Sequence, residues 1–245
     1  MCIYNNLFNI ADLCSYFDKN HIGKHGYIES RLPKVLSYLE KNRGMPFVLN
    51  YLTESYGFEG IVEIIVQNNY FFLWSKITEG PSQLEYILMT KMYDPIFLDW
   101  AINNRFISIL DFATLHVRLN FGRHKYLESN MTALLKELEV HNDHSMLTEY
   151  LLDNYERTSI VSAILKYNFK GLWRTLVADP IELEAILSEC VDTPSFIPKF
   201  FEEVRLNRNI VKLLVKTGNG KRMASYLKKH FKLVELLKFY VFSIF

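Results

Sequence analysis

Apolar side chains recur every three or four residues through most of this chain, and short polar breaks interrupt them. This spacing places the apolar residues on one face of a helix, whereas a half-buried strand would alternate at every second residue. The helical period is clearest over residues 126–140, and no long stretch alternates with a period of two. The pattern predicts an all-α fold of about fourteen helices joined by short turns.

One part of this pattern occurs twice. Residues 61–88 read IVEIIVQNNYFFLWSKITEGPSQLEYIL, and residues 160–187 read IVSAILKYNFKGLWRTLVADPIELEAIL. The two segments align without a gap at an offset of 99, and 11 of their 28 positions are identical, including Trp74 and Trp173. Each predicts an apolar helix, a break at Asn, a Leu-Trp helix, a break at Pro and a third helix. Self-similarity at a fixed offset is typical of repeat architectures.

We therefore expect an α-solenoid of stacked antiparallel helix pairs with an internal duplication at an offset of 99 residues. Residues 1–30 are predicted to form an N-terminal helix and an extended loop. Residues 31–245 are predicted to form the solenoid, with repeat halves at about 58–155 and 156–245. A compact all-α bundle is the alternative.

Aspartate-proline pairs mark two predicted helix starts. Asp94-Pro95 and Asp179-Pro180 each combine a good N-cap with a residue suited to the first helical position. The last helices are expected at 210–215, 223–231 and 233–242, with a sharp turn at Gly218-Asn-Gly. These residues, continuing as Lys-Arg, lack the spacing of a phosphate-binding loop, so a helix-connecting turn is the favoured interpretation.

The composition narrows the class of protein. The chain is 49% hydrophobic and 22% charged, which excludes a disordered protein. Its three cysteines, Cys2, Cys14 and Cys190, form no CxxC pair, so we expect neither a disulfide framework nor a zinc site. A reducing, cytoplasmic location is expected. No run of about 20 apolar residues occurs, and no basic leader precedes the first apolar residues, so neither a membrane span nor a signal peptide is expected.

Charge is distributed unevenly. The net charge is +1, but residues 199–245 contain 11 basic and three acidic residues, a net of +8. Helical spacing places many of these basic residues along common faces, where like charges repel each other. A solvated face and a surface for an anionic partner (RNA phosphate, an acidic protein or a membrane) are the two interpretations. The candidate contact residues are Arg205, Arg208, Lys212, Lys216, Lys221, Arg222, Lys228, Lys229 and Lys232.

The loop predicted at residues 18–30 is a second candidate contact. It contains His21, Lys24 and His25 among glycines, and it has almost no apolar periodicity. We interpret it as an arm that contacts a partner. The spacing of His21 and His25 would suit two metal ligands, and so would that of the histidines at 141 and 144, but further ligands are missing, so no metal is predicted.

Catalytic chemistry is not indicated elsewhere. The acidic neighbour Glu189 disfavours a thiolate at Cys190. Trp74 and Trp173 are expected to join adjacent helices, with a peptide- or base-stacking site as the alternative. No RNA-recognition motif is present. The sequence therefore predicts a binding protein with no catalytic residue, metal or cofactor, and not an enzyme.

The second half also carries a resemblance. The segments MLTEYLLDNYERTSIVSAILKYNFKGLWRTLV and RNIVKLLVKTGNGKRMASYLKKHFKLVELLKFY are similar to the C-terminal helical domain of class C vacuolar-sorting tethering proteins, which has the same rhythm of short apolar helices and polar breaks. No β-propeller precedes them, as one would in a full tethering subunit.

A small chain of this kind also resembles the ribosome-bound dormancy factors of microsporidia. That resemblance implies a non-enzymatic, monomeric hibernation factor that blocks the tRNA exit region and contacts ribosomal proteins and rRNA. The alternative is a vesicle-trafficking adaptor that binds other helical proteins through an apolar groove or through residues 233–245. A viral ankyrin-like protein is a weaker alternative, because neither a TPLH signature nor a 33-residue period occurs.

Overall fold

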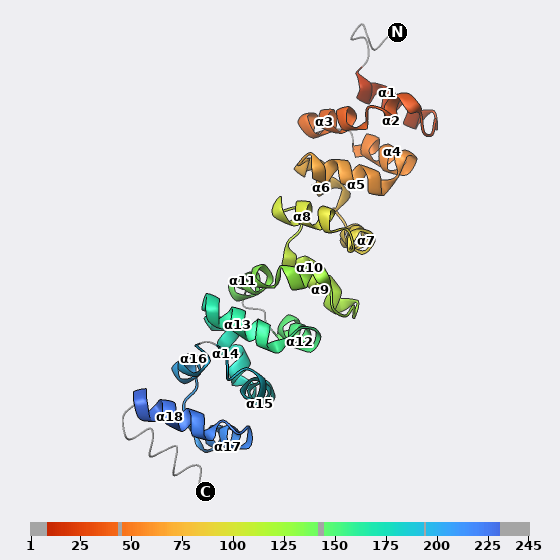
Figure 1. Cartoon of the computed structure of the whole chain (residues 1–245). Coiled ribbons are helices and arrows are strands. Elements are labelled where there is room, and N and C mark those ends of the chain that lie inside the picture. The colour runs from red at the N-terminus through yellow and green to blue at the C-terminus, as the bar shows by residue number, and fades with distance from the viewer. Residues whose placement is uncertain (1–8, 44–45, 142–144, 194, 231–245) are drawn as a thin grey trace. The chain divides into compact units, whose positions relative to one another are not determined.

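The computed structural model describes residues 9–43, 46–141, 145–193 and 195–230 (Figure 1). These residues form eighteen helices and no strand, so the predicted all-α class is confirmed. The chain divides into two compact units, residues 1–108 and 109–245. The two repeat halves were expected at about 58–155 and 156–245. The boundary between the two compact units, at 108/109, is therefore not the boundary between those halves. Stacking of all helices into one solenoid stays a prediction.

Unit 1 holds the first eight helices, most of them about three turns long. They are α1 (Ile10–Lys19), α2 (Gly26–Glu29), α3 (Leu32–Asn42), α4 (Pro46–Tyr56), α5 (Phe58–Gln67), α6 (Phe71–Ile77), α7 (Pro81–Lys91) and α8 (Pro95–Asn103). Helix α4 packs against α1 and α5, and α6 packs against α3 and α5.

Unit 2 holds the remaining ten helices. They are α9 (Ile109–Arg118), α10 (Lys125–Ser129), α11 (Met131–His141), α12 (Ser145–Asn154), α13 (Arg157–Tyr167), α14 (Lys170–Ala178), α15 (Pro180–Glu189), α16 (Phe196–Glu203), α17 (Arg208–Lys216) and α18 (Gly220–His230). Helices α17 and α18 lie where helices were predicted, at 210–215 and 223–231. The helix predicted at 233–242 lies outside the described residues.

The helices of the two units correspond at the offset of 99 residues. Helices α9 and α11 begin and end 99 positions after α1 and α3. Helix α12 packs against α9 and α13, as α4 does against α1 and α5, and α14 packs against α11 and α13, as α6 does against α3 and α5. The helices of residues 10–103 in unit 1 can therefore be compared position by position with residues 109–202 of unit 2.

The segment predicted as an extended arm is held in place in unit 1. The hydroxyl group of Tyr56 accepts a hydrogen bond from the backbone N–H of His25 at 3.0 Å and donates one to its carbonyl at 3.3 Å. The hydroxyl group of Tyr51 donates to the carbonyl of Gly23 at 3.2 Å. His25 caps α2 by accepting from the backbone N–H of Tyr27. The expected loop at 18–30 therefore contains the end of α1 and the short helix α2.

A carboxylate caps the Leu-Trp helix in each unit. Glu40, on α3, accepts hydrogen bonds from the backbone N–H groups of Phe72 and Leu73 at 3.1 and 3.0 Å. In unit 2, Glu139 on α11 does the same for Gly171 and Leu172, at 2.9 Å each. The first N–H groups of a helix have no partner within it, so this carboxylate satisfies two of them and joins two helices.

The core of each unit contains its repeated tryptophan. Trp74 is 7% exposed and Trp173 is 3% exposed. The ring of Trp74 packs edge-on against Phe106, and that of Trp173 packs edge-on against Phe196. Trp173 therefore joins α14 to α16, as the favoured interpretation expected, and Trp74 joins α6 to the segment that follows α8. Both tryptophans are too buried to stack on a base.

Candidate functional site: the basic helices α17 and α18

The basic residues at the end of unit 2 are carried by two amphipathic helices. Asn207 caps α17 by accepting a hydrogen bond from the backbone N–H of Ile210 at 3.0 Å. Val211 and Leu214 are buried, which leaves the opposite face of α17 to solvent. The exposed basic residues on that helix are Arg208, Lys212 and Lys216.

Helix α18 packs against α17 and is organised in the same way. Met223, Ala224 and Leu227 are buried. The exposed basic residues on α18 are Lys221, Arg222, Lys228 and Lys229. Together with Arg205, which is exposed in the segment before α17, the basic residues of the two helices form what we call the basic surface. Lys232, which was expected to belong to it, lies outside the described residues.

The turn between the two helices has a structural role. Gly218 has a φ of +75°, a conformation that favours glycine. Asn219 is buried, and its side-chain amide donates to the carbonyls of Leu187 at 2.6 Å and Thr217 at 3.2 Å. The turn is therefore hydrogen-bonded to α15, which supports the interpretation of the turn as a connection between two helices.

Two members of the basic surface are neutralised by acids of unit 2. The Nζ atom of Lys216 lies 2.5 Å from Oε1 of Glu184, and Arg222 forms an ion pair with Asp192. Each acid lies about 30 residues before its basic partner in the sequence. The helical spacing of the basic residues therefore could not predict these ion pairs. Exposed pairs contribute little to stability, about 0–1 kcal/mol each.

The remaining basic residues are the part of the basic surface that is available to bind an anion. Five exposed members of the basic surface have no acidic partner within the described part of the chain: Arg205, Lys212, Lys221, Lys228 and Lys229. Such a group of uncompensated charges attracts phosphate and other anions. The residues of the candidate arm belong to unit 1: His21 and His25 lie there, and Lys24 is paired there with Glu29 at 2.6 Å.

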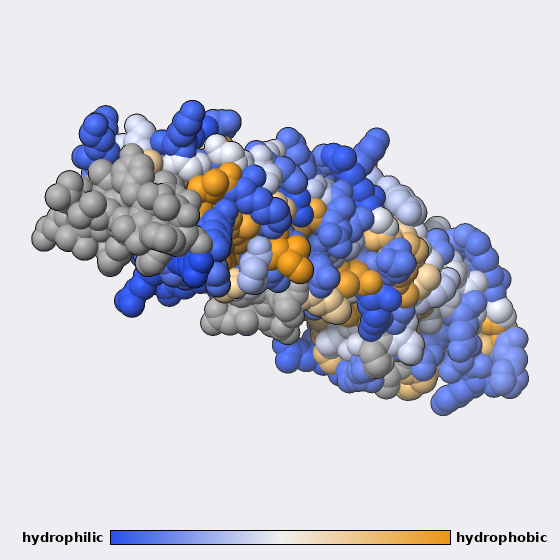
Figure 2. Space-filling view, turned by 90° about the horizontal axis from the view of Figure 1, so that it is seen from below, coloured by the Kyte–Doolittle hydropathy of each residue, from blue (hydrophilic) through white to orange (hydrophobic). Residues whose placement is uncertain are grey.

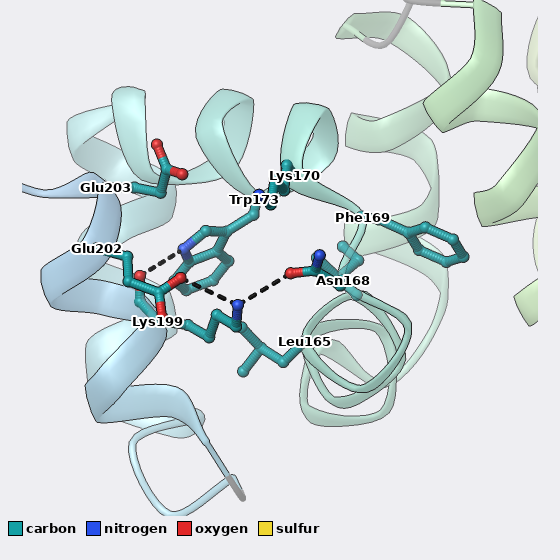
Figure 3. A pocket seen from close by; sticks show the side chains of 9 residues that line it. Leu165, Asn168, Phe169, Lys170, Trp173, Lys199, Glu202 and Glu203 are labelled. Atoms are coloured by element: carbon teal, nitrogen blue, oxygen red, sulfur yellow. Dashed lines mark hydrogen bonds and ion pairs between the residues drawn. The ribbon is translucent and has the colours of Figure 1, made fainter.

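A small pocket lies beside Trp173 (Figure 3). Lys199 crosses it, with Nζ donating to Oδ1 of Asn168 at 2.9 Å and to Oε2 of Glu202 at 3.0 Å. The indole N–H of Trp173 donates to the carbonyl of Lys199 at 3.1 Å. The space left is about 10 Å³, enough for about one water molecule. The pocket therefore serves packing.

The two described cysteines are buried, and their thiols are poor nucleophiles. Burial raises the pKa of Cys14 to about 12 and that of Cys190 to about 11, where Glu189 adds to the effect. A thiol with so high a pKa is a poor nucleophile. No cluster of three or more metal-ligating side chains occurs among the described residues.

The face of the molecule drawn in Figure 2 is mostly hydrophilic, with smaller apolar areas between the polar ones. None of the described helices is both long enough and apolar enough to cross a lipid bilayer. Comparison with protein families, with curated proteins and with solved structures finds no match to this chain.

Proposed function

We propose that this chain is a non-enzymatic, monomeric binding protein that docks on the ribosome through the basic surface and acts as a dormancy factor. The observation that carries the proposal is the set of five exposed cations without acidic partners among the described residues, on and beside two helices that pack against each other. Ribosomal RNA is a polyanion, and phosphate contacts supply most of the affinity of such an interaction.

The choice of the ribosome among anionic partners rests on the resemblance to ribosome-bound dormancy factors. By that resemblance the protein works in the cytoplasm, contacts ribosomal proteins and rRNA, and hinders the tRNA exit region sterically. A steric role needs no catalytic group.

Cosedimentation with purified ribosomes over a range of salt concentrations tests this proposal. The test variant replaces Lys212, Lys221, Lys228 and Lys229 with alanine. The control variant removes the same charge from four exposed lysines outside the basic surface: Lys19, Lys34, Lys41 and Lys125. We expect the test variant to lose affinity and the slope of log K against log salt to become shallower by about 3, because about 0.7–0.9 counterions are released per phosphate contact. Equal binding of both variants would contradict the proposal.

A helical adaptor is the second candidate, because unit 1 exposes an apolar stripe. Its members lie on α7, on α8 and between them at spacings of three and four residues, and they are 41–77% exposed: Tyr86, Met89, Tyr93, Ile96 and Trp100. Single exposed apolar residues need no explanation, but several large ones on two consecutive helices favour an interaction surface.

The equivalent positions in unit 2 are not a stripe of large apolar residues. They are Ala185, Ser188, Asp192, Ser195 and Lys199. The fold of a unit therefore does not require apolar residues there. An adaptor would bind its partner through this stripe with little salt dependence. The double variant Ile96→Ser/Trp100→Lys, which introduces the unit 2 residues, would then abolish co-purification of that partner, whereas the basic-surface variant would retain it.

A further inference from the structure

Helix α18 carries one hydroxyl group among its basic residues. Ser225 is the only serine or threonine in α17 or α18, and its side chain is exposed. Residues three and four positions apart are neighbours on the surface of a helix. At these positions on either side of it, Ser225 has four exposed cations: Lys221, Arg222, Lys228 and Lys229. The hydroxyl group therefore lies within the basic surface, with two cations on the turn before it and two on the turn after it.

The charge around Ser225 is largely uncompensated. Arg222 forms an exposed ion pair with Asp192, but the three lysines have no acidic partner among the described residues. Helix α18 itself contains no acidic residue. A phosphoserine carries a charge of about −1.5 to −2 at pH 7. One phosphate group at this position would therefore offset half or more of the charge of the three lysines.

Helix α18 is placed to present this serine to an enzyme. Among the described helices it packs mainly against α17, and it is the last of them along the chain (Figure 1). Its ion pair with Asp192 is exposed and adds little stability. Elements with few buried contacts open locally at a small part of the free energy of global unfolding. Local opening of α18 would let a kinase bind residues 221–225 in an extended conformation.

We infer that Ser225 is a phosphorylation site whose modification prevents the basic surface from binding anions. Kinases select substrates partly by their pattern of charges, and basic residues three and four positions before a serine, as at Arg222 and Lys221, suit a basophilic kinase. Oγ of Ser225 forms a bond to the γ-phosphorus of ATP, and the bond from that phosphorus to its bridging oxygen breaks. The hydroxyl proton passes to the catalytic base of the kinase, and ADP leaves. The inference rests on the proposed function, because it takes the basic surface to be the binding surface.

A phosphate group on Ser225 would find its partners on the same helix. An anion placed four residues before a cation, as Ser225 is before Lys229, is the favourable order for a helix. Hydrogen bonds from lysine or arginine to a phosphate are among the strong ones. The modification should therefore leave α18 helical and occupy cations that would otherwise contact the phosphates of a partner.

Phosphorylation of the full chain with ATP and the catalytic subunit of cyclic-AMP-dependent protein kinase, which is basophilic, tests the site. We expect one phosphate per chain by intact mass, on Ser225 by peptide fragmentation. Ser225→Ala should take up no phosphate, and Arg222→Gln should lose most of the uptake. The control is Ser188→Ala, at an exposed serine of α15 that lies near Glu184 and Glu189, and it should be phosphorylated like the parent. No uptake by the parent, or equal uptake by Ser225→Ala, would overturn the inference.

The effect on binding is measured with poly(U) as a single-stranded polyanion, by fluorescence anisotropy over a range of salt concentrations. The phosphorylated chain should bind about tenfold or more weakly than the unmodified chain at low salt, and the slope of log K against log salt should be shallower by about 1–2. Equal binding by the two forms would overturn the inference. Poly(U) binding that is lost on phosphorylation, in a protein that does not sediment with ribosomes, would support the inference and contradict the proposed function.

Discussion

The hydroxyl group of Tyr155 accepts a hydrogen bond from the backbone N–H of His124 at 3.0 Å and donates one to the carbonyl of the same residue at 3.3 Å. Tyr56 and His25 make the same two bonds in unit 1. The pair is buried in unit 2 and exposed in unit 1, so water can replace the lost partner only in unit 1.

Tyr155→Phe should therefore destabilise the protein more than Tyr56→Phe. We expect a loss of about 1–3 kcal/mol for the buried pair, because two backbone groups lose their partner, and less than about 1 kcal/mol for the exposed pair. Urea unfolding followed by circular dichroism measures both. Equal losses would show that burial does not determine the strength of this contact.

The carboxylate of Glu139 offers a test of helix capping between helices. Glu139→Ala should lower the free energy of unfolding by about 1–3 kcal/mol, because the N–H groups of Gly171 and Leu172 lose their acceptor. Glu139→Gln retains one acceptor oxygen and should cost less. Glu137→Ala, two residues earlier on α11, is the control and should change stability by no more than about 0.5 kcal/mol.

His116 should make unit 2 sensitive to acid. It is 1% exposed, and neither ring nitrogen has a hydrogen-bond partner among the described residues. Burial, with a smaller contribution from His124, lowers the pKa of His116 from 6.5 to about 4. Between these values the unfolded chain binds a proton that the folded chain does not, so stability falls as the pH falls, by up to about 1.4 kcal/mol per pH unit.

Phe17 occupies the equivalent position of unit 1, which suggests the matching variant. His116→Phe should be more stable than the parent at pH 5 and should lose this part of the pH dependence. His21→Ala, at an exposed histidine, should retain the dependence due to His116. Urea midpoints at pH 7 and pH 5 provide the comparison, and a parent and a His116→Phe variant with the same difference between the two midpoints would refute the assignment.

The exposed stripe and the buried core of unit 1 should respond differently to substitution. Ile96→Ser/Trp100→Lys should change the free energy of unfolding by about 0.5 kcal/mol or less, because both side chains are exposed and unit 2 has these residues. Trp74→Ala should cost about 3–5 kcal/mol, because it leaves a cavity between helices. Thermal unfolding distinguishes the two. A large loss from the double variant would mean that the stripe supports the fold.

Local sequence patterns were sufficient for the class of fold and for several helix starts. Three-to-four spacing predicted helices, and Asp94 and Asp179 accept the backbone hydrogen bonds expected of N-caps. The break expected at Asn69 and Asn168 is present too: both residues have a φ of +57°, in the left-handed region that asparagine tolerates.

Contacts between segments could not be predicted in the same way. The segments GKHGYIES (23–30) and GRHKYLES (122–129) lie at the same offset of 99, so extending the repeat toward the N-terminus would have indicated a shared role. The glycines of the first segment instead suggested a loop. The tyrosine that holds each segment lies 31 residues from the histidine, so local spacing gave no sign of the contact.

The sequence separation between the residues that these hydrogen bonds join bears on how fast each unit folds. The bonds from Tyr51, Tyr56 and Glu40 span 28 to 33 residues in unit 1, and those from Trp173 and Asn219 span 26 and 32 residues in unit 2. These bonds stay within one unit, and most close contacts of the chain join residues that are near one another in the sequence. Proteins with predominantly short-range contacts fold in microseconds to milliseconds. Each unit should therefore complete its own structure soon after its residues leave the ribosome, before distant parts of the chain are needed.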